Sequence, residues 1–291
     1  MTTSEPPIPV ATADQAMPAD KRSRAGRDLG AAIAVGVGLG GVVIATLLLF
    51  RDGFAIVVGL AVVVGVWELI RAMDGDGARQ PVVPLVLGSI SMMALTYLRG
   101  ADGLVISFMI TVLACIVWRL ADGASGYLHD ISTTVLIATY VPLLAGFAVL
   151  LSLPDDGAAR VIAFIATVVC SDVGGYAAGV VFGKHPLAAS VSPKKSWEGL
   201  AGSMLACAVG GALFLTLGLD GRWWQGALFG VAIAATSTLG DLGESMLKRD
   251  LGIKDMGSLL PGHGGLMDRL DSLLPSAAVA WILLSYMVPP G

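Results

Sequence analysis

Residues 225–248 read QGALFGVAIAATSTLGDLGESMLK and join an apolar run to a polar stripe. The run 225–240 carries no charge, and the whole segment exceeds the ~20 residues that a helix needs to cross a bilayer. A polar stripe follows at helical spacings of three and four residues, made of Ser237, Asp241, Glu244, Ser245 and Lys248. Such a stripe must face water or other polar groups rather than lipid. We therefore predict a transmembrane helix that lines a polar site.

The rest of the chain has the composition of a polytopic membrane protein. Hydrophobic residues make up 55% of its 291 residues and charged residues only 14%, and the mean hydropathy is +0.80. Soluble domains carry about 25% charged residues, so an ordinary soluble domain is excluded. The predicted fold class is all-α, with re-entrant segments as an alternative for the second and third spans. Hydropathy predicts about nine transmembrane helices, at 29–50, 54–70, 82–98, 103–118, 132–153, 158–182, 199–218, 225–248 and 273–288.

Basic residues divide unequally between the two ends of these spans. We interpret residues 1–27, rich in Pro, Ala, Ser and Asp and ending in KRSRAGR, as a disordered cytoplasmic tail before a transmembrane domain at 28–291. With this tail inside, 14 of the 18 Lys and Arg residues fall on the cytoplasmic side and 4 outside. Positive charge favours the cytoplasmic side. We therefore expect a cell-membrane protein whose charged loops, 183–198 and 249–272, face the cytoplasm and whose C-terminus lies outside.

Two acidic residues lie inside other predicted spans. Asp172 lies ten residues before the inner end of 158–182, about 15 Å deep at 1.5 Å per residue. A carboxylate at that depth is a functional candidate, and a structural hydrogen bond between helices is the alternative. Glu68, beside Arg71 at the inner end of 54–70, is expected to reach the membrane interface instead.

The loop after the polar stripe ends in a glycine-rich turn. Residues 261–265 read PGHGG, and glycines let backbone N–H groups surround an anion. His263 could hydrogen-bond a phosphate or transfer a proton, unless it is incidental to a flexible turn. Asp268 is expected to bind a metal ion together with Asp241, because Mg²⁺ bridges carboxylates and phosphates. Asp271 is interpreted as a helix cap.

The loop before 199–218 is basic. Residues 190–199 read SVSPKKSWEG. Lys194 and Lys195, with the hydroxyl groups of Ser190 and Ser192, supply charges and adaptable donors for phosphate. Binding to anionic lipid headgroups, or a role in topology alone, would explain the two lysines equally well.

Both loops resemble motifs of a known enzyme family. The pattern Ser245-x-Leu247-Lys248-Arg249, then Lys254-Asp255, then Pro261-x-His263-Gly264-Gly265-x-x-Asp268-Arg269-x-Asp271 resembles the signature of phosphatidate cytidylyltransferases, also called CDP-diacylglycerol synthases. The run Ser192-Pro193-Lys194-Lys195-Ser196-x-Glu198-Gly199 resembles the family's second motif. Asp172 with Tyr176 also matches, although Val173 stands where relatives often have a small hydroxyl residue. The first 150 or so residues resemble the family only in hydropathy.

The resemblance implies transfer of the cytidylyl group of CTP to phosphatidate, giving CDP-diacylglycerol and pyrophosphate for phospholipid biosynthesis. It also implies a homodimer in the bilayer, and we expect no nucleic-acid partner. The predicted cofactor is Mg²⁺, as one or two ions, with Mn²⁺ as a substitute. The expected metal ligands are Asp241 and Asp268; the expected catalytic residues are Lys248, Arg249, His263 and Arg269; and the expected substrate-binding residues are Asp172, Ser190, Ser192, Lys194, Lys195 and Lys254.

Two other classes of function are alternatives to this one. A secondary transporter would also place charge within a helical bundle, but it should show broken helices near the midplane and repeat symmetry. A related membrane lipid phosphotransferase or cytidylyltransferase that acts on an isoprenoid lipid is the closer alternative.

Overall fold

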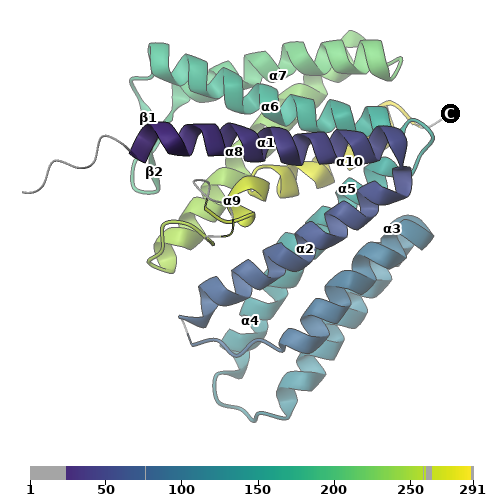
Figure 1. Cartoon of the computed structure of the whole chain (residues 1–291), viewed down its shortest axis with the longest axis vertical. Helices are drawn as coiled ribbons and strands as arrows, with labels where there is room; N and C mark the ends of the chain where they lie inside the picture. The colour runs from purple at the N-terminus through teal and green to yellow at the C-terminus, as the bar shows by residue number, and fades with distance from the viewer. Residues whose placement is uncertain (1–23, 76, 258, 260–263, 290–291) are drawn as a thin grey trace, which may run out of the picture.

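The computed structural model describes residues 24–75, 77–257, 259 and 264–289, and most of them are helical (Figure 1). Within these described ranges, seven helical segments are long and apolar enough to cross a membrane, which confirms the prediction of an all-α, multi-pass membrane protein. The predicted tail lies largely outside the described residues, and the first helix begins at Arg24. The helices are α1 (Arg24–Leu49), α2 (Arg51–Asp74), α3 (Val82–Leu120), α4 (Tyr127–Ala138), the π-helix η1 (Thr139–Leu143), α5 (Leu144–Ser152), α6 (Gly157–Phe182), α7 (Trp197–Gly218), α8 (Trp223–Asp250), α9 (Met267–Leu270) and α10 (Leu273–Met287).

Helix α3 contains two of the nine predicted spans. It has non-helical backbone angles at Gly100, with φ 64° and ψ −143°, a conformation that glycine adopts readily. The chain turns back at this point, so that Gly88 in the first half packs against the side chain of Thr111 in the second (Figure 1). Of α1, the structure describes the side chains of Gly36–Leu49, and this part is apolar but shorter than a full span. The number of membrane crossings therefore stays a prediction.

Two clusters of buried side chains hold the helices together. One joins α2, α3, η1 and α9, and the other joins α2, α6, α8 and α10. The rings of Phe147 and Trp281, whose centroids lie 5.5 Å apart, pack against both clusters. The bundle therefore fixes α8 and α10 relative to α2.

Helices α6, α7 and α8 approach one another closely through glycines. A Cβ atom at Gly226 of α8 would lie 2.6 Å from the Cα atom of Ala212 of α7, a separation that a side chain cannot occupy. On α6, a Cβ atom at Gly179 would lie 3.8 Å from the Cα atom of Gly199. Small residues allow such close contacts in lipid, where packing rather than the hydrophobic effect joins helices. This packing holds both α6 and α8 against α7.

Between α6 and α7 the chain forms an antiparallel hairpin of β1 (Pro186–Ala188) and β2 (Ser192–Ser196), where the sequence predicted only a loop. The Oγ atom of Ser196 caps α7 by accepting the backbone N–H of Gly199 at 3.1 Å. Glu198 holds the residue before β1, because its Oε1 atom lies 2.6 Å from Nδ1 of His185. The hairpin is thus anchored at its base.

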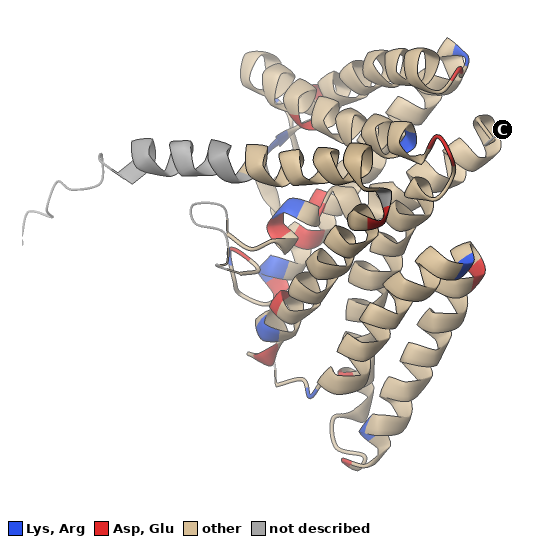
Figure 2. Cartoon of the chain, turned by 45° about the vertical axis from the view of Figure 1, so that its right-hand side comes forward, with Lys and Arg blue, Asp and Glu red and all other residues tan. Residues whose placement is uncertain are grey.

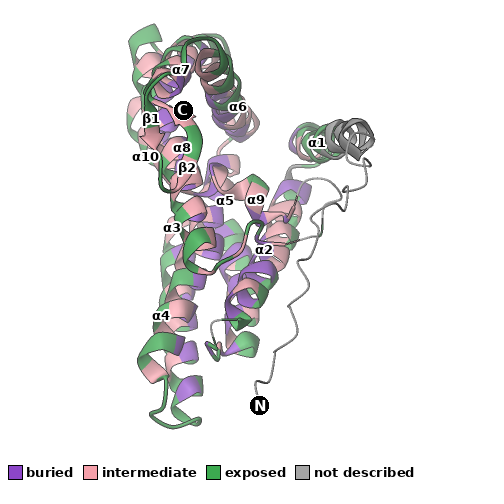
Figure 3. Ribbon diagram, turned by 90° about the vertical axis from the view of Figure 1, so that its left-hand side faces the viewer, coloured by how far each residue is buried: buried purple, intermediate pink, exposed green. Residues whose placement is uncertain are grey.

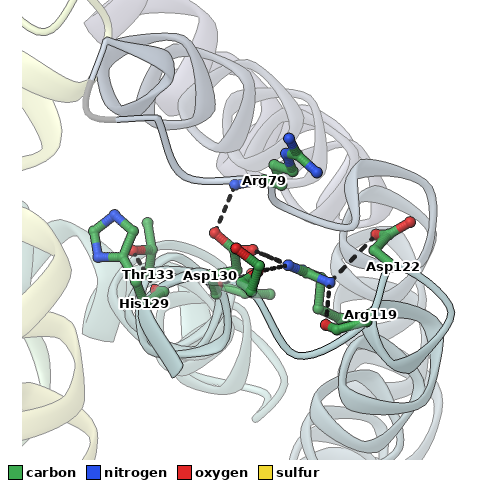
Figure 4. Close-up of polar contacts among 9 residues, drawn as sticks. Arg79, Arg119, Asp122, His129, Asp130 and Thr133 are labelled. Carbon is green, nitrogen blue, oxygen red and sulfur yellow. Dashed lines mark hydrogen bonds and ion pairs between the residues drawn. The ribbon is translucent and has the colours of Figure 1, made fainter. Parts of the chain in front are cut away.

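A buried ion pair closes the connection between α3 and α4 (Figure 4). The Nε atom of Arg119 donates to Asp130 at 2.6 Å, and both residues are at most 2% exposed. Asp130 also accepts the backbone N–H of Arg79 at 2.8 Å. Arg79 and Arg119 are among the 14 basic residues that the sequence predicts on the cytoplasmic side. Arg119 also has this structural role.

Candidate active site

Charged residues gather where α8 passes α9 and the start of α10, whereas elsewhere they lie mainly near helix ends (Figure 2). A cavity of about 380 Å³ lies in this region. Its lining comes from α6, β2, α8 and the α9–α10 segment, and consists of Asp172, Lys195, Asp241, Ser245, Asp268, Arg269, Asp271 and Ser272. The structure therefore brings together five of the predicted site residues from four separate parts of the chain. We call this space the polar cavity.

A second cavity, of about 250 Å³, adjoins the polar cavity between α6, α7 and α8. The two share Asp172, Lys195 and Asp241, and Lys194 lines only the second. Both lysines of the basic loop therefore face space that a ligand could occupy.

Strand β2 places Lys195 directly against α8. The Nζ atom of Lys195 donates to Oδ2 of Asp241 at 2.5 Å, and each side chain is 28% exposed. An ion pair of this kind can exchange partners with a charged ligand, because neither group is fully buried. The expected placement of Lys195 and Asp241 at one site is thus seen in the structure.

The C-terminal part of the polar stripe on α8 takes part in two ion pairs that share Lys248. The Nζ atom of Lys248 lies 2.8 Å from Oε1 of Glu244 and also pairs with Asp268. Asp268 accepts the backbone N–H groups of Gly265 at 2.7 Å and Met256 at 3.1 Å. These contacts make Asp268 the link between α8 and the glycine turn, and they leave it less available to a cation than Asp241.

Glu68 lies beneath this turn, and the expectation that it reaches the membrane interface was wrong. It is 1% exposed, and its oxygens accept the backbone N–H groups of Leu266 at 3.0 Å and Met267 at 2.9 Å. A Cβ atom at Gly265 would lie only 2.7 Å from its Oε2 atom. Leu266 and Met267, which follow the glycine turn, supply the donors that a buried charge requires, and the backbone at Gly265 lies against the carboxylate.

Asp271 was interpreted as a helix cap, but the N-cap residue of α10 is Ser272, with no side-chain cap hydrogen bond, and the structure places Asp271 at the polar cavity. Its Oδ1 atom accepts the backbone N–H of Ser272 at 2.7 Å, immediately before α10. Its carboxyl group lies beside that of Asp241 on the cavity wall. The sequence signal was the three-residue spacing from Asp268, which places both on one helix face.

The remaining predicted residues do not line the polar cavity. Ser190 and Arg249 line a different cavity of about 690 Å³, together with Tyr140 and Glu244. Arg249 follows Lys248 by one residue, and a turn of about 100° explains why the two face different spaces. Tyr140, which no sequence motif had indicated, comes from η1, and its buried hydroxyl group has no hydrogen-bond partner among the described residues.

Three further predicted site residues are not assigned to any of these cavities: Ser192, Lys254 and His263. Ser192 begins β2, and Lys254 is exposed on the loop after α8. Neither lines the cavities of about 250, 380 or 690 Å³. His263 lies outside the described residues.

The carboxylates of the polar cavity suit a magnesium ion that shares its ligands with a substrate. Among the described residues, no group of three or more His, Cys, Asp or Glu side chains is arranged to hold a metal ion alone. However, Mg²⁺ is usually bound by one or two carboxylates, with water and substrate phosphates completing its shell. Asp241 and Asp271 lie side by side; the repulsion between them is relieved in part by Lys195, and a divalent cation between the two carboxylates would relieve it further. This donor set therefore fits Mg²⁺.

Comparison with known proteins extends the similarity over nearly the whole chain. A family model described as the cytidylyltransferase family matches residues 30–287. The chain is 46% identical over 284 residues to a phosphatidate cytidylyltransferase of Mycobacterium bovis, covering 93% of this chain and 92% of the relative. It is 45% identical over 300 residues to that of Mycobacterium leprae, covering 94% and 96%. For the enzyme of Helicobacter pylori, identity is 34% over 253 residues, covering 84% and 89%.

Proposed function

The chain belongs to the cytidylyltransferase family, and from this premise we propose that it transfers the cytidylyl group of CTP to phosphatidate. The products are CDP-diacylglycerol and pyrophosphate. The observation that supports this most directly is the polar cavity, in which Lys195 and Arg269 face Asp172, Asp241 and Asp271 within a membrane bundle. Cations and carboxylates around one space suit a reaction between two phosphate compounds.

The reaction joins two anions, so charge and alignment govern its rate. A phosphate oxygen of phosphatidate forms a bond to the α-phosphorus of CTP, while the bond from that phosphorus to the bridging oxygen of pyrophosphate breaks. The attacking oxygen is already an anion, and no strong general base is required. Lys195 and Arg269 are placed to neutralise the phosphates and hold them in line, and Lys194 adds charge from the adjoining cavity.

Asp241 and Asp271 would hold Mg²⁺ in this proposal, with Asp172 nearby on α6. When bound, the ion supplies positive charge to the CTP phosphates and to the departing pyrophosphate. Lys195 would then exchange Asp241 for a substrate phosphate. Asp268 stays a candidate ligand, but its contacts with Lys248 and two backbone N–H groups favour a positioning role.

We further propose that the polar cavity faces the cytoplasm in the cell membrane and that two copies of the chain associate. The unequal distribution of basic residues supports this orientation. Dimerisation is supported by family resemblance. Chemical cross-linking in native membranes tests it, because a dimer would give a single product of twice the monomer mass.

Transfer by purified protein to a panel of lipids tests the reaction. The protein in lipid nanodiscs would receive Mg²⁺, CTP labelled at the α- or γ-phosphate, and phosphatidate, diacylglycerol, a polyprenyl phosphate or a polyprenol. We expect the α-label to enter lipid only with phosphatidate, and the γ-label to leave as pyrophosphate. Transfer of the α-label to the polyprenyl phosphate, or of the γ-label to the polyprenol, would instead identify an isoprenoid-lipid enzyme.

A further inference from the structure

A wholly apolar cavity of about 140 Å³ lies beside the polar cavity. Helices α1, α2, α5, α6 and α10 contribute to its walls, together with η1 and the last residue of α9. Its lining includes Phe54, Val58, Ala61, Ala148, Phe164 and Leu273, and none of its lining residues is polar. We call it the apolar cavity. The cytidylyl-transfer site described above makes no use of it.

The two cavities share one short segment of chain. Asp268, Arg269, Asp271 and Ser272 line the polar cavity, whereas Leu270, Leu273 and Leu274 line the apolar cavity. Within residues 268–274, the polar side chains therefore line one cavity and the apolar side chains line the other. A ligand with a phosphate in the first space would have its hydrocarbon part next to the second.

The apolar cavity has the dimensions of part of an acyl chain. Its lining extends from Phe54 to Val62 along α2, about 12 Å at 1.5 Å per residue, and on another wall from Leu270 of α9 to Ala277 of α10. An apolar cavity of about 150 Å³ can hold benzene, so this one has room for roughly six carbon atoms.

Helix α1 lies at the edge of the molecule (Figure 3). Val43 of α1 lines the cavity, and Leu47 packs with Phe54 of α2. Towards the start of the helix, a Cβ atom at Gly36 or Gly40 would meet no atom of another segment within 4 Å. A lipid chain that approaches from this edge therefore meets a helix that is packed along only part of its length.

We propose that the apolar cavity is the subsite for one acyl chain of the lipid substrate. The assignment rests on the proposed function, because phosphatidate is the ligand that carries a phosphate and hydrocarbon chains together. Lipid tails are as apolar as leucine, so entry from the bilayer gains little from the hydrophobic effect. The subsite acts by shape, because a chain held between α2 and α10 brings the phosphate to Lys195 and Arg269.

Photo-cross-linking of the wild-type protein tests the subsite directly. Phosphatidate with a diazirine in the middle of one chain would be irradiated with the protein in nanodiscs, and adducts would be located by peptide mass spectrometry. We expect adducts on lining residues of α2 and α10, such as Val58 and Leu273, that excess unlabelled phosphatidate suppresses. Adducts confined to exposed positions such as Val105 and Met109 of α3, or adducts that do not respond to the competitor, would overturn the proposal.

Filling the cavity gives an independent measure. Ala148→Leu adds three carbon atoms to its wall, and Ala114→Leu makes the same change at an exposed position of α3. The ratio of kcat/KM for dioleoyl over dibutanoyl phosphatidate, whose chains are too short to fill the space, should fall about tenfold in Ala148→Leu, as overpacking predicts, and stay within about twofold in Ala114→Leu. An unchanged ratio in Ala148→Leu contradicts the subsite. Should Ala148→Leu be inactive with both lipids, the smaller Ala148→Val decides by the same ratio.

The short-chain lipid also separates this proposal from the reaction on which it rests. If the wild-type protein transfers cytidylyl groups to neither lipid, the proposed function fails. If it uses both lipids, but the cross-links and the ratio do not behave as stated, the acyl subsite alone fails.

Discussion

At the scale of single residues, the two lysines of the basic loop are not equivalent. Lys195 pairs with Asp241 at the point where two cavities meet, whereas Lys194 is exposed and lines only the smaller one. Both side chains line the smaller cavity, but only Lys195 also reaches the polar cavity. The two side chains should therefore differ in their effect on substrate use.

Replacing either lysine by alanine should lower kcat/KM, and Lys195→Ala should be the more severe. A charge-assisted contact contributes about 1.5–3 kcal/mol, which corresponds to roughly a tenfold to hundredfold loss. We expect Lys194→Ala near the lower value and Lys195→Ala near the upper one, measured with CTP and phosphatidate below saturation. Lys184→Ala, exposed near the same hairpin, is the control and should be nearly unchanged. Full activity of the Lys194→Ala, Lys195→Ala double variant would mean that the loop serves topology only.

The carboxylates of the polar cavity should differ in what they stabilise. Asp241→Asn and Asp271→Asn should each lower cytidylyl transfer about a hundredfold or more while the protein keeps its melting temperature in the absence of metal. Asp268→Asn should lose activity and also melt earlier, since an amide cannot replace the charge that faces Lys248.

A metal titration checks the same assignment without an activity readout. Mg²⁺ should raise the melting temperature of the wild type but not that of Asp241→Asn, because a ligand stabilises only the state that binds it. Equal stabilisation of both proteins would remove Asp241 from the metal site. Ordinary activity of Asp241→Asn at saturating Mg²⁺ would make that carboxylate structural.

At the scale of elements, the glycine turn depends on a helix far away in the sequence. Glu68 of α2 accepts N–H groups at the start of α9, and Asp268 accepts others from either side of the turn. Two carboxylates, from α2 and α9, thus hold the loop that follows α8. Loss of either should loosen the loop rather than remove a substrate contact.

Glu68→Ala should therefore lower both stability and activity. A buried donor left unsatisfied costs about 1–3 kcal/mol, and this change removes the acceptor of two backbone N–H groups. The free energy of unfolding should fall by at least about 1 kcal/mol. Asp74→Ala, an exposed acidic position at the end of the same helix, should stay within about 0.5 kcal/mol of the wild type. Comparable stability of the two variants would show that the loop does not depend on Glu68.

At the scale of the whole molecule, the charged loops meet at one site, although α7 and α8 separate them in the sequence. Strand β2 and the α9–α10 segment both contribute to the polar cavity. The hydropathy pattern and the charge distribution assign both to the cytoplasmic side of a multi-pass protein. The two loops must lie on one side of the membrane if they are to share a substrate.

Cysteine labelling in intact cells tests this orientation. A membrane-impermeant maleimide should label Asp220→Cys, in the turn between α7 and α8, and should leave Lys184→Cys and Asp255→Cys unlabelled until the cells are opened. Asp255 is preferable to Gly257, where a Cβ atom would meet the carboxylate of Glu68. Labelling of Asp255→Cys in intact cells would reverse the predicted topology.

The sequence by itself determined the class of the protein and most of the chemistry of its site. Long apolar runs can satisfy their backbone groups in lipid only as helices, so composition was sufficient to predict an all-α membrane protein. Helical spacing placed Asp241 and Lys248 on one face of α8, and the motifs identified Lys195, Asp268 and Arg269 as site residues. These signals are local, or follow from the resemblance to a family.

Tertiary structure alone decided which of these groups meet. It placed Asp271 beside Asp241, buried Glu68 under the glycine turn, turned Arg249 towards another cavity and opened an apolar space next to the polar one. Periodicity states which side chains share a face of a helix, but it does not state which faces pack together. That choice depends on close contacts between helices, such as the glycine contacts of α6, α7 and α8, and these are made between residues far apart in the chain.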